Sequence, residues 1–153
     1  MSVPLITRET MFEPLLVADP SFKLRWDEFK LRWDEFKTEW ADEPEPPLYL
    51  ALGSLAEHLL ERLGRGDTGG FDGIFAVVER WHTEGDAYVR EAASIGLLES
   101  LQNQLGGNDR VYTRFGGVSA VALESWLRPE TKRWWDKLYR YWDGETGALR
   151  FDT

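Results

Sequence analysis

A tandem repeat of seven residues constrains the fold of this chain more than any other feature of its sequence. The unit KLRWDEF occupies residues 23–29 and recurs unchanged at residues 30–36. Alternating spacings of four and three place six aromatic residues on one face of an α-helix: Phe22, Trp26, Phe29, Trp33, Phe36 and Trp40. Because seven residues make almost two full turns, the second copy lengthens the helix by roughly 10 Å and rotates its aromatic face by only about 20°. The repeat therefore predicts one long, aromatic-rich helix over about residues 20–40.

Charged side chains within the repeat favour the same helix. Three pairs of opposite charge lie four residues apart: Lys23 with Asp27, Glu28 with Arg32, and Lys30 with Asp34. Each such pair stabilises a helix by roughly 0.2–0.5 kcal/mol. Leu24 and Leu31 fall on the side opposite the aromatic residues, so we expect the back of the helix to contact another part of the protein as well.

A coiled coil is the main alternative that a heptad suggests. Two copies fall short of the three or four heptads that a coiled coil requires, and large aromatic residues at every seam position fit knobs-into-holes packing poorly. We therefore expect an elongated helix inside a monomeric globular domain, with weak self-association through this helix as the alternative. An unbroken copy of one segment within a helix is typical of a recent or engineered duplication.

The charge balance limits the classes of partner that the chain can bind. Acidic residues outnumber basic residues 27 to 18, so the formal net charge is −9. This balance argues against a nucleic-acid-binding protein, which presents a basic surface to phosphates. It is compatible with a basic protein partner, because opposite net charges speed encounter. It is equally compatible with an acidic surface that only keeps the protein soluble.

Cysteine usage and the N-terminal sequence indicate an intracellular protein. The chain has no cysteine, which excludes disulfides, thiolate zinc sites and cysteine nucleophiles. Its first residues contain neither a basic segment nor a long apolar run, unlike a signal peptide. No stretch approaches the roughly 20 apolar residues of a membrane span. We therefore expect a cytoplasmic protein that makes no membrane contact.

Amphipathic spacing, with Pro and Gly between the segments, predicts further helices along the chain. At 153 residues the chain has the length of one domain with a real core. Asp19 and Pro20 suit the cap and first turn of the long helix. The other predicted helices cover about residues 8–17, 47–63, 71–83, 87–105, 118–126 and 129–142, and no strong pattern marks residues 144–153. The predicted fold class is an all-α single domain of six or seven helices.

The segment at residues 86–101 resembles the second helix of a HEAT-type repeat. In that motif an Asp caps the helix and an Arg reaches back toward the adjoining turn, the positions held here by Asp86 and Arg90. A narrow row of small residues on the same helix lets a neighbour approach closely: Val89, Ala93, Gly96 and Ser100. We therefore expect stacked HEAT-like hairpins but no full solenoid, which needs several repeats.

Sequence patterns that carry enzymatic chemistry are missing. The two histidines, His58 and His82, lie in separate amphipathic segments without the spacing of a metal site, and we expect both at a helix surface or boundary. Neither a nucleophile elbow nor a phosphate-binding loop is present in the sequence. We therefore predict a protein that is not an enzyme, with no catalytic residue, no metal and no cofactor.

An ordered series of segments resembles a family of small bacterial helical proteins of unknown function. The segments are PSF at residues 20–22 with the aromatic spacing that follows it, PPLYLAL at 46–52, GDAYVREAASIGLLESLQN at 85–103 and LRPETKRWWDKL at 127–138. Several such proteins resemble immunity proteins of contact-dependent or secreted toxin systems. In the family the aromatic helix carries the seven-residue unit once, so the second copy is a departure from it.

The resemblance implies that the chain binds and neutralises a toxin domain by occluding its active site. Carboxylates suit this role when the toxin has a basic catalytic cleft. The expected partner-binding residues are Asp42, Glu43, Glu45, Glu91 and Glu99. Asp86, Arg90 and Asn103 are expected to serve the fold. The alternatives are a general helical adaptor, an enzyme with a deep polar pocket, and an engineered chain in which the duplication has removed the native activity.

Overall fold

Helices make up nearly all of the regular structure in the computed structural model, which describes residues 5–36, 48–105, 120–145 and 147. Their order is α1 (Phe12–Ala18), α2 (Lys23–Phe36), α3 (Leu48–Gly64), α4 (Phe71–Glu84), α5 (Ala87–Glu91), α6 (Glu99–Gln104), α7 (Ala120–Glu124) and α8 (Pro129–Trp142). A 3-10 turn, η1 (Pro20–Phe22), leads into α2, and a π-helical segment, η2 (Ala92–Leu98), joins α5 to α6. The predicted all-α single domain is confirmed, whereas the HEAT-like stacking of its hairpins stays a prediction.

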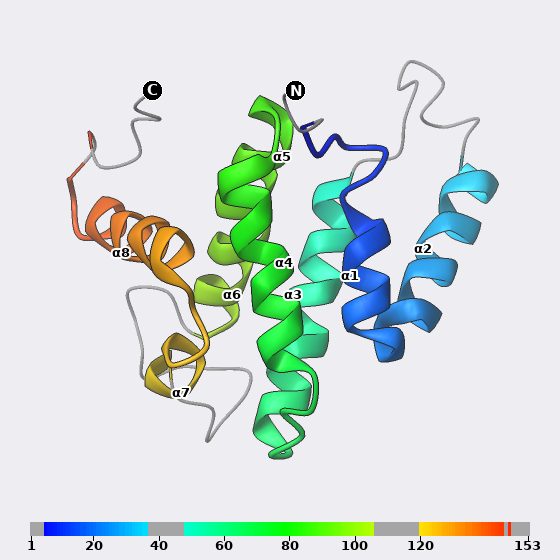
Figure 1. The fold of residues 1–153 in the computed structure, drawn as a ribbon, viewed down its shortest axis with the longest axis horizontal. Coiled ribbons are helices and arrows are strands. Elements are labelled where there is room, and N and C mark those ends of the chain that lie inside the picture. Colours follow the sequence, from blue (N-terminus) through cyan, green and yellow to red (C-terminus); the bar gives the residue numbers. More distant parts are fainter. Residues whose placement is uncertain (1–4, 37–47, 106–119, 146, 148–153) are drawn as a thin grey trace.

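Helices α3 and α4 run through the middle of the domain, with α1 and α2 on one side and α7 and α8 on the other (Figure 1). The apolar stripes that the sequence predicts on these two central helices are buried, including Leu52, Leu55 and Leu59 of α3 and Ile74, Phe75 and Trp81 of α4. Large rings from other elements complete this core, among them Phe22 of η1 and Trp135 of α8. Burial of such side chains is the main favourable contribution to folding.

Helix α1 begins at Phe12, later than the predicted start at residue 8. The residues before it form a turn, in which the Met11 N–H donates to the Thr7 carbonyl at 2.9 Å. Pro14 lies in the first turn of α1, where its missing N–H would have no acceptor within the helix. The Trp81 indole N–H donates to the Met11 carbonyl at 3.0 Å and so ties the start of α1 to α4.

The helix predicted over residues 87–105 follows the predicted path, but its middle third is the π-helical segment η2. A Cβ atom on Gly96 would lie 2.7 Å from Leu52 Cδ1 and 3.2 Å from Tyr49 Cδ1, so any larger residue would require these side chains to shift, and glycine allows the close approach of η2 to α3. The expected close contact along the row of small residues is therefore confirmed at Gly96. The expected roles of Asp86 and Arg90 are confirmed too, because Asp86 Oδ1 accepts from the Val89 N–H at 2.9 Å and Arg90 Nε donates to the Gly85 carbonyl at 2.8 Å. The expectation for Asn103 gains no support, since its side chain is exposed on α6.

Helix α8 takes its N-terminal cap from another helix. The Glu79 carboxylate of α4 accepts the backbone N–H groups of Glu130 and Thr131 at 3.0 and 2.8 Å, and the Thr131 hydroxyl at 2.8 Å. A carboxylate at this end also interacts favourably with the helix dipole. The Gln102 side chain connects α6 to α8, because its Nε2 donates to the Trp135 carbonyl at 2.9 Å.

Both histidines are buried, so their expected place at a helix surface or boundary is wrong. His58 of α3 is 9% exposed and His82 of α4 is 5% exposed. Burial is the main cause that lowers the pKa of His82 to about 4, although the charges of Glu79 and Glu130 act in the opposite direction. His82 is therefore a neutral member of the core at pH 7.

The back of α2 contradicts a second expectation. Leu24 and Leu31 are 70% and 59% exposed, so no residue that the structure describes covers them. Of the three predicted charge pairs on α2, the pair between Lys23 Nζ and Asp27 Oδ1 forms, at 2.7 Å. Lys30 and Arg32 form no ion pair with any residue in the described ranges. Helix α2 is described as far as Phe36, and the predicted continuation to residue 40 lies outside the described residues.

Candidate functional site

The strongest candidate site is a surface that we call the Tyr49 face, formed by Tyr49 of α3 with Tyr88, Glu91, Ile95 and Glu99. The last four follow one side of the path from α5 through η2 to α6, at helical spacing. Tyr49 and Tyr88 meet edge to face, with ring centroids 6.2 Å apart and an interplanar angle of 89°. Glu91 is exposed, whereas Ile95, Glu99 and the two tyrosines are half-buried. The face therefore combines an aromatic and aliphatic centre with carboxylates at its edge.

Electrostatics at the Tyr49 face favour a positively charged partner group. Burial is the main cause that raises the pKa of Tyr49 to about 12, and the neighbouring Glu91, Tyr88 and Glu99 raise it further. Burial also raises the pKa of Glu99. Neither Glu91 nor Glu99 has an ion pair within the described part of the chain. A cationic group of a partner would therefore meet two carboxylates whose negative charges are not paired with any cation of the described residues.

Many other acidic residues in the domain are already engaged. Several of them form ion pairs: Glu57 and Glu61 with Arg25, Glu84 with Arg80, Glu130 with Arg133, and Asp136 with Lys132. Glu79 accepts the N-terminal N–H groups of α8. Glu91 and Glu99 thus differ from these residues, because their charges serve no described contact that holds the fold together.

Tyr88 already binds a cation within the chain. The Arg8 guanidinium carbon lies 4.5 Å from the centroid of the Tyr88 ring, a cation–π contact. This contact ties the segment before α1 to α5 at the edge of the Tyr49 face. It also demonstrates that an arginine side chain fits against this part of the surface.

The structure tests the positions of only some of the predicted partner-binding residues. Glu91 and Glu99 both lie near enough to Tyr49 for their charges to raise its pKa. Asp42, Glu43 and Glu45 lie outside the described residues.

Sequence reasoning missed both tyrosines of this face. Tyr88 precedes Glu91 by three residues, and this helical spacing was enough to find it. Tyr49 lies on another helix, and only the close packing of η2 on α3 at Gly96 brings it beside the carboxylates.

A second polar cluster, which the sequence did not reveal, lies inside the domain around Asp19. Asp19 was expected to cap the long helix, but its side chain makes no cap bond and is 2% exposed. Its carboxylate accepts from the Ser21 hydroxyl, lies 3.3 Å from His58 Nε2, and accepts from Arg62 Nη1 at 3.2 Å. Burial raises the pKa of Asp19, but the hydrogen bonds of His58 and Ser21 and the charge of Arg62 outweigh it, so that the pKa is lowered.

The Asp19 cluster contains the three residue types of a serine hydrolase triad without its geometry. In such a triad one imidazole nitrogen faces the serine and the other faces the aspartate. Here His58 Nε2 faces both, at 2.9 Å from Ser21 Oγ and 3.3 Å from Asp19 Oδ2. The Ser21 hydroxyl donates to Asp19 instead of to a base. The arrangement therefore gives no path for a proton from serine through histidine to aspartate.

The Asp19 cluster instead joins three parts of the fold. Arg62 of α3 also donates from Nε to Asp67 Oδ2 at 3.2 Å and from Nη2 to the Gly69 carbonyl, in the turn between α3 and α4. Charged hydrogen bonds of this kind are strong when buried. One sequence pattern could have indicated this cluster. His58 and Arg62 lie four residues apart among the leucines of α3, a spacing that puts both on one side of the helix.

Two structural features bear on metal binding and on membranes, within residues 5–36, 48–105, 120–145 and 147. No group of three or more His, Cys, Asp or Glu side chains in these ranges is placed to hold a metal ion. None of the helices in the same ranges combines the length and apolar character needed to cross a membrane.

Comparisons with known proteins place the chain in a family. No curated protein and no solved structure matches it. A family model matches residues 12–143, which include every helix from α1 to α8. The chain therefore belongs to the family described as Domain of unknown function (DUF7674).

Proposed function

We propose that this chain is a protein-binding domain that neutralises a bacterial toxin domain by occluding a basic active site. The observation that carries the proposal is the pair of carboxylates, Glu91 and Glu99, beside the half-buried ring of Tyr49 without an ion pair in the described residues. The segments resemble a family of small bacterial helical proteins, several of which resemble immunity proteins, and this resemblance supports a toxin as the class of partner.

Physical chemistry favours a basic protein over other ligands for the Tyr49 face. Aromatic residues at the centre of an interface provide much of its binding energy, and carboxylates near them select cationic side chains. The net charge of −9 would speed the approach of a basic domain. Partial burial of Glu99 means that part of its desolvation has already occurred in the free protein.

The partner is tested by capture from the source bacterium with this chain as bait, followed by mass spectrometry. Recovery of a domain that kills cells lacking this chain would support the proposal. Recovery of housekeeping proteins alone would contradict toxin immunity and favour a helical adaptor.

The site is tested by measuring the affinity for the captured partner by calorimetry. The double variant Glu91→Gln/Glu99→Gln should bind at least about tenfold more weakly, which corresponds to about 1.4 kcal/mol. The matched control Asp27→Asn/Asp136→Asn removes the same charge from exposed positions of α2 and α8 and should change the affinity by less than about twofold. Equal losses in the two double variants would rule out the Tyr49 face as the binding surface.

The linker acids form a separate part of the proposal. The triple variant Asp42→Asn/Glu43→Gln/Glu45→Gln should also weaken binding, because these residues add a concentrated negative charge. Unchanged affinity in this variant would remove the three residues from the proposed binding surface and leave the Tyr49 face to be judged on its own variants.

A further inference from the structure

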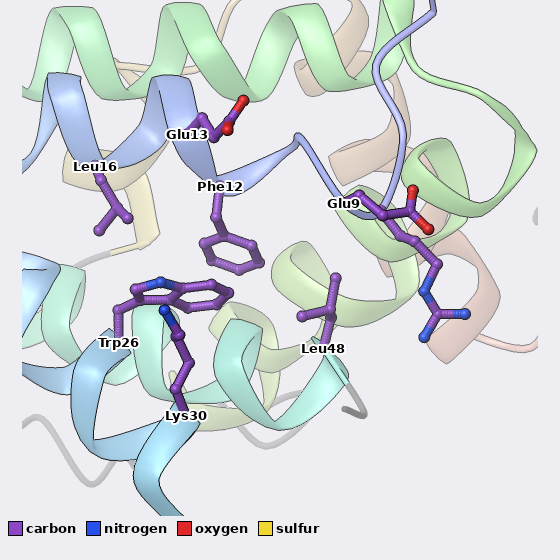
Figure 2. Close-up of a pocket in the computed structure, with 8 residues that line it drawn as sticks. Glu9, Phe12, Glu13, Leu16, Trp26, Lys30 and Leu48 are labelled. Carbon is purple, nitrogen blue, oxygen red and sulfur yellow. The ribbon is translucent and has the colours of Figure 1, made fainter. Parts of the chain in front are cut away.

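A hollow of about 360 Å³ lies between α1, α2 and the start of α3, and Arg8 of its lining contacts Tyr88 at the edge of the Tyr49 face. We call it the α1–α2 hollow. Its apolar lining comes from Phe12, Leu16, Trp26 and Leu48, and Lys30 stands at its side (Figure 2). The volume lies near the lower end of the range for small-molecule sites, roughly 300–1,000 Å³. It is large enough for a ligand of one ring system.

A pair of stacked aromatic rings forms part of the lining. The centroids of Phe12 and Trp26 are 4.4 Å apart with an interplanar angle of 20°. Phe12 is 3% exposed, whereas Trp26 is half-buried and offers more of its ring to a ligand. A flat, apolar ligand would gain contact with this pair and with the two leucines, because aromatic rings favour stacked and edge contacts with other rings.

The charged groups around the hollow decide whether it favours a positively or a negatively charged ligand. Lys30 lines the hollow together with Trp26 (Figure 2), and it forms no ion pair with any residue of the described ranges. Figure 2 shows the carboxylates of Glu9 and Glu13 turned away from the Phe12–Trp26 pair. The Arg8 guanidinium is held over the Tyr88 ring. Of the two cations in the lining, Lys30 is therefore the one that no described contact engages, and its ammonium group attracts an anion.

We propose that the α1–α2 hollow binds a small aromatic carboxylate, with its ring against Phe12 and Trp26 and its anionic group at Lys30. This proposal does not rest on the protein-binding function, because the residues that carry it, Phe12, Trp26 and Lys30, are not part of the Tyr49 face.

The test is a titration of the ¹⁵N-labelled protein with indole-3-acetate, followed by NMR. The indole N–H resonance of Trp26, identified by its loss in Trp26→Phe, should shift. Indole has the same ring without a charge and should bind about fivefold more weakly, as expected for an exposed ion pair of about 1 kcal/mol. Tryptamine, which carries a positive charge, should bind more weakly still.

Matched variants test the role assigned to Lys30. Lys30→Met should weaken indole-3-acetate binding about fivefold and leave indole binding unchanged. Lys23→Met is the control, because Lys23 holds the equivalent position in the first copy of the repeat and pairs with Asp27. It should leave both affinities unchanged. Because Lys30 is exposed, its replacement is not expected to unfold the domain.

Three outcomes would overturn the proposal. The first is an unshifted Trp26 resonance at millimolar indole-3-acetate. The second is equal affinity for indole and indole-3-acetate. The third is equal binding of indole-3-acetate by Lys30→Met and Lys23→Met.

Discussion

Arg25 and Arg32 hold the same position in the two copies of the seven-residue unit, yet their surroundings differ. Arg25 lies half-buried against α3, with Nη1 3.3 Å from Glu57 Oε1 and Nη2 2.8 Å from Glu61 Oε2. It also donates to the Ser54 carbonyl at 3.3 Å. Arg32 is exposed and forms no ion pair with a residue that the structure describes.

The tryptophans of the two copies differ in the same way, because the one in the first copy is packed more closely than the one in the second. Trp26 stacks on Phe12 and contacts Phe29 at a centroid distance of 5.7 Å, and both Trp26 and Phe29 pack against the core. Trp33, the equivalent of Trp26, is half-buried and has no ring partner among the described residues. Identical sequences therefore make different contributions to the fold, because packing depends on how far along α2 each copy lies.

The comparison explains how the domain accommodates a duplication. Seven residues extend α2 by roughly 10 Å with little rotation, so the first copy keeps its contacts with α1 and α3. Deletion of residues 23–29 or of residues 30–36 gives the same shorter sequence, in which Lys37 takes the position of Lys30 and Trp40 that of Trp33. The residue types that pack against the core and line the α1–α2 hollow are thus retained.

The largest difference between the copies is expected at tryptophan. Trp26→Ala should lower the free energy of unfolding by about 2–3 kcal/mol, because it removes a half-buried ring stacked on Phe12. Trp33→Ala should lower it by less than about 1 kcal/mol. Urea unfolding followed by circular dichroism measures both values, and similar losses would show that the second copy contributes as much to the core as the first.

A smaller difference is expected at arginine. Arg25→Ala should lower the free energy of unfolding by about 1 kcal/mol, since it removes a partly shielded group with carboxylate and carbonyl partners. Arg32→Ala should stay within about 0.3 kcal/mol of the parent chain. Repeating the urea experiment in 1 M salt should reduce the Arg25 effect, and a loss at Arg32 of equal size would break the comparison.

The smallest effect is expected for removal of a whole copy. Deletion of residues 30–36 should change the free energy of unfolding by no more than about 0.5 kcal/mol, because the packed residue types of α2 are retained. It should also preserve indole-3-acetate binding. A loss of several kcal/mol would instead indicate that the added turns had become part of the core.

Local sequence patterns were sufficient for much of the fold. The helical periods of α2, α3, α4 and α8, the cap at Asp86 and the contact of Arg90 with Gly85 were all predictable, because each depends on residues a few positions apart. Membership in a family of unknown function is confirmed by the family match over residues 12–143, whereas the resemblance to immunity proteins stays a prediction. Of the candidate site, the sequence identified Glu91 and Glu99 from charge and helical position, and their role in binding stays a prediction.

Contacts between distant segments could not be derived in this way. The sequence by itself determined an all-α chain whose long helix keeps one aromatic phase through both copies, since that phase follows from spacing along a single helix. Only the tertiary structure decided that the first copy packs, that Asp19 meets His58 and Arg62, and that Tyr49 lies beside Glu91 and Glu99. The physical reason is that burial and charge pairing depend on which surfaces the other helices cover, and residues 30–36 repeat a sequence without repeating its neighbours.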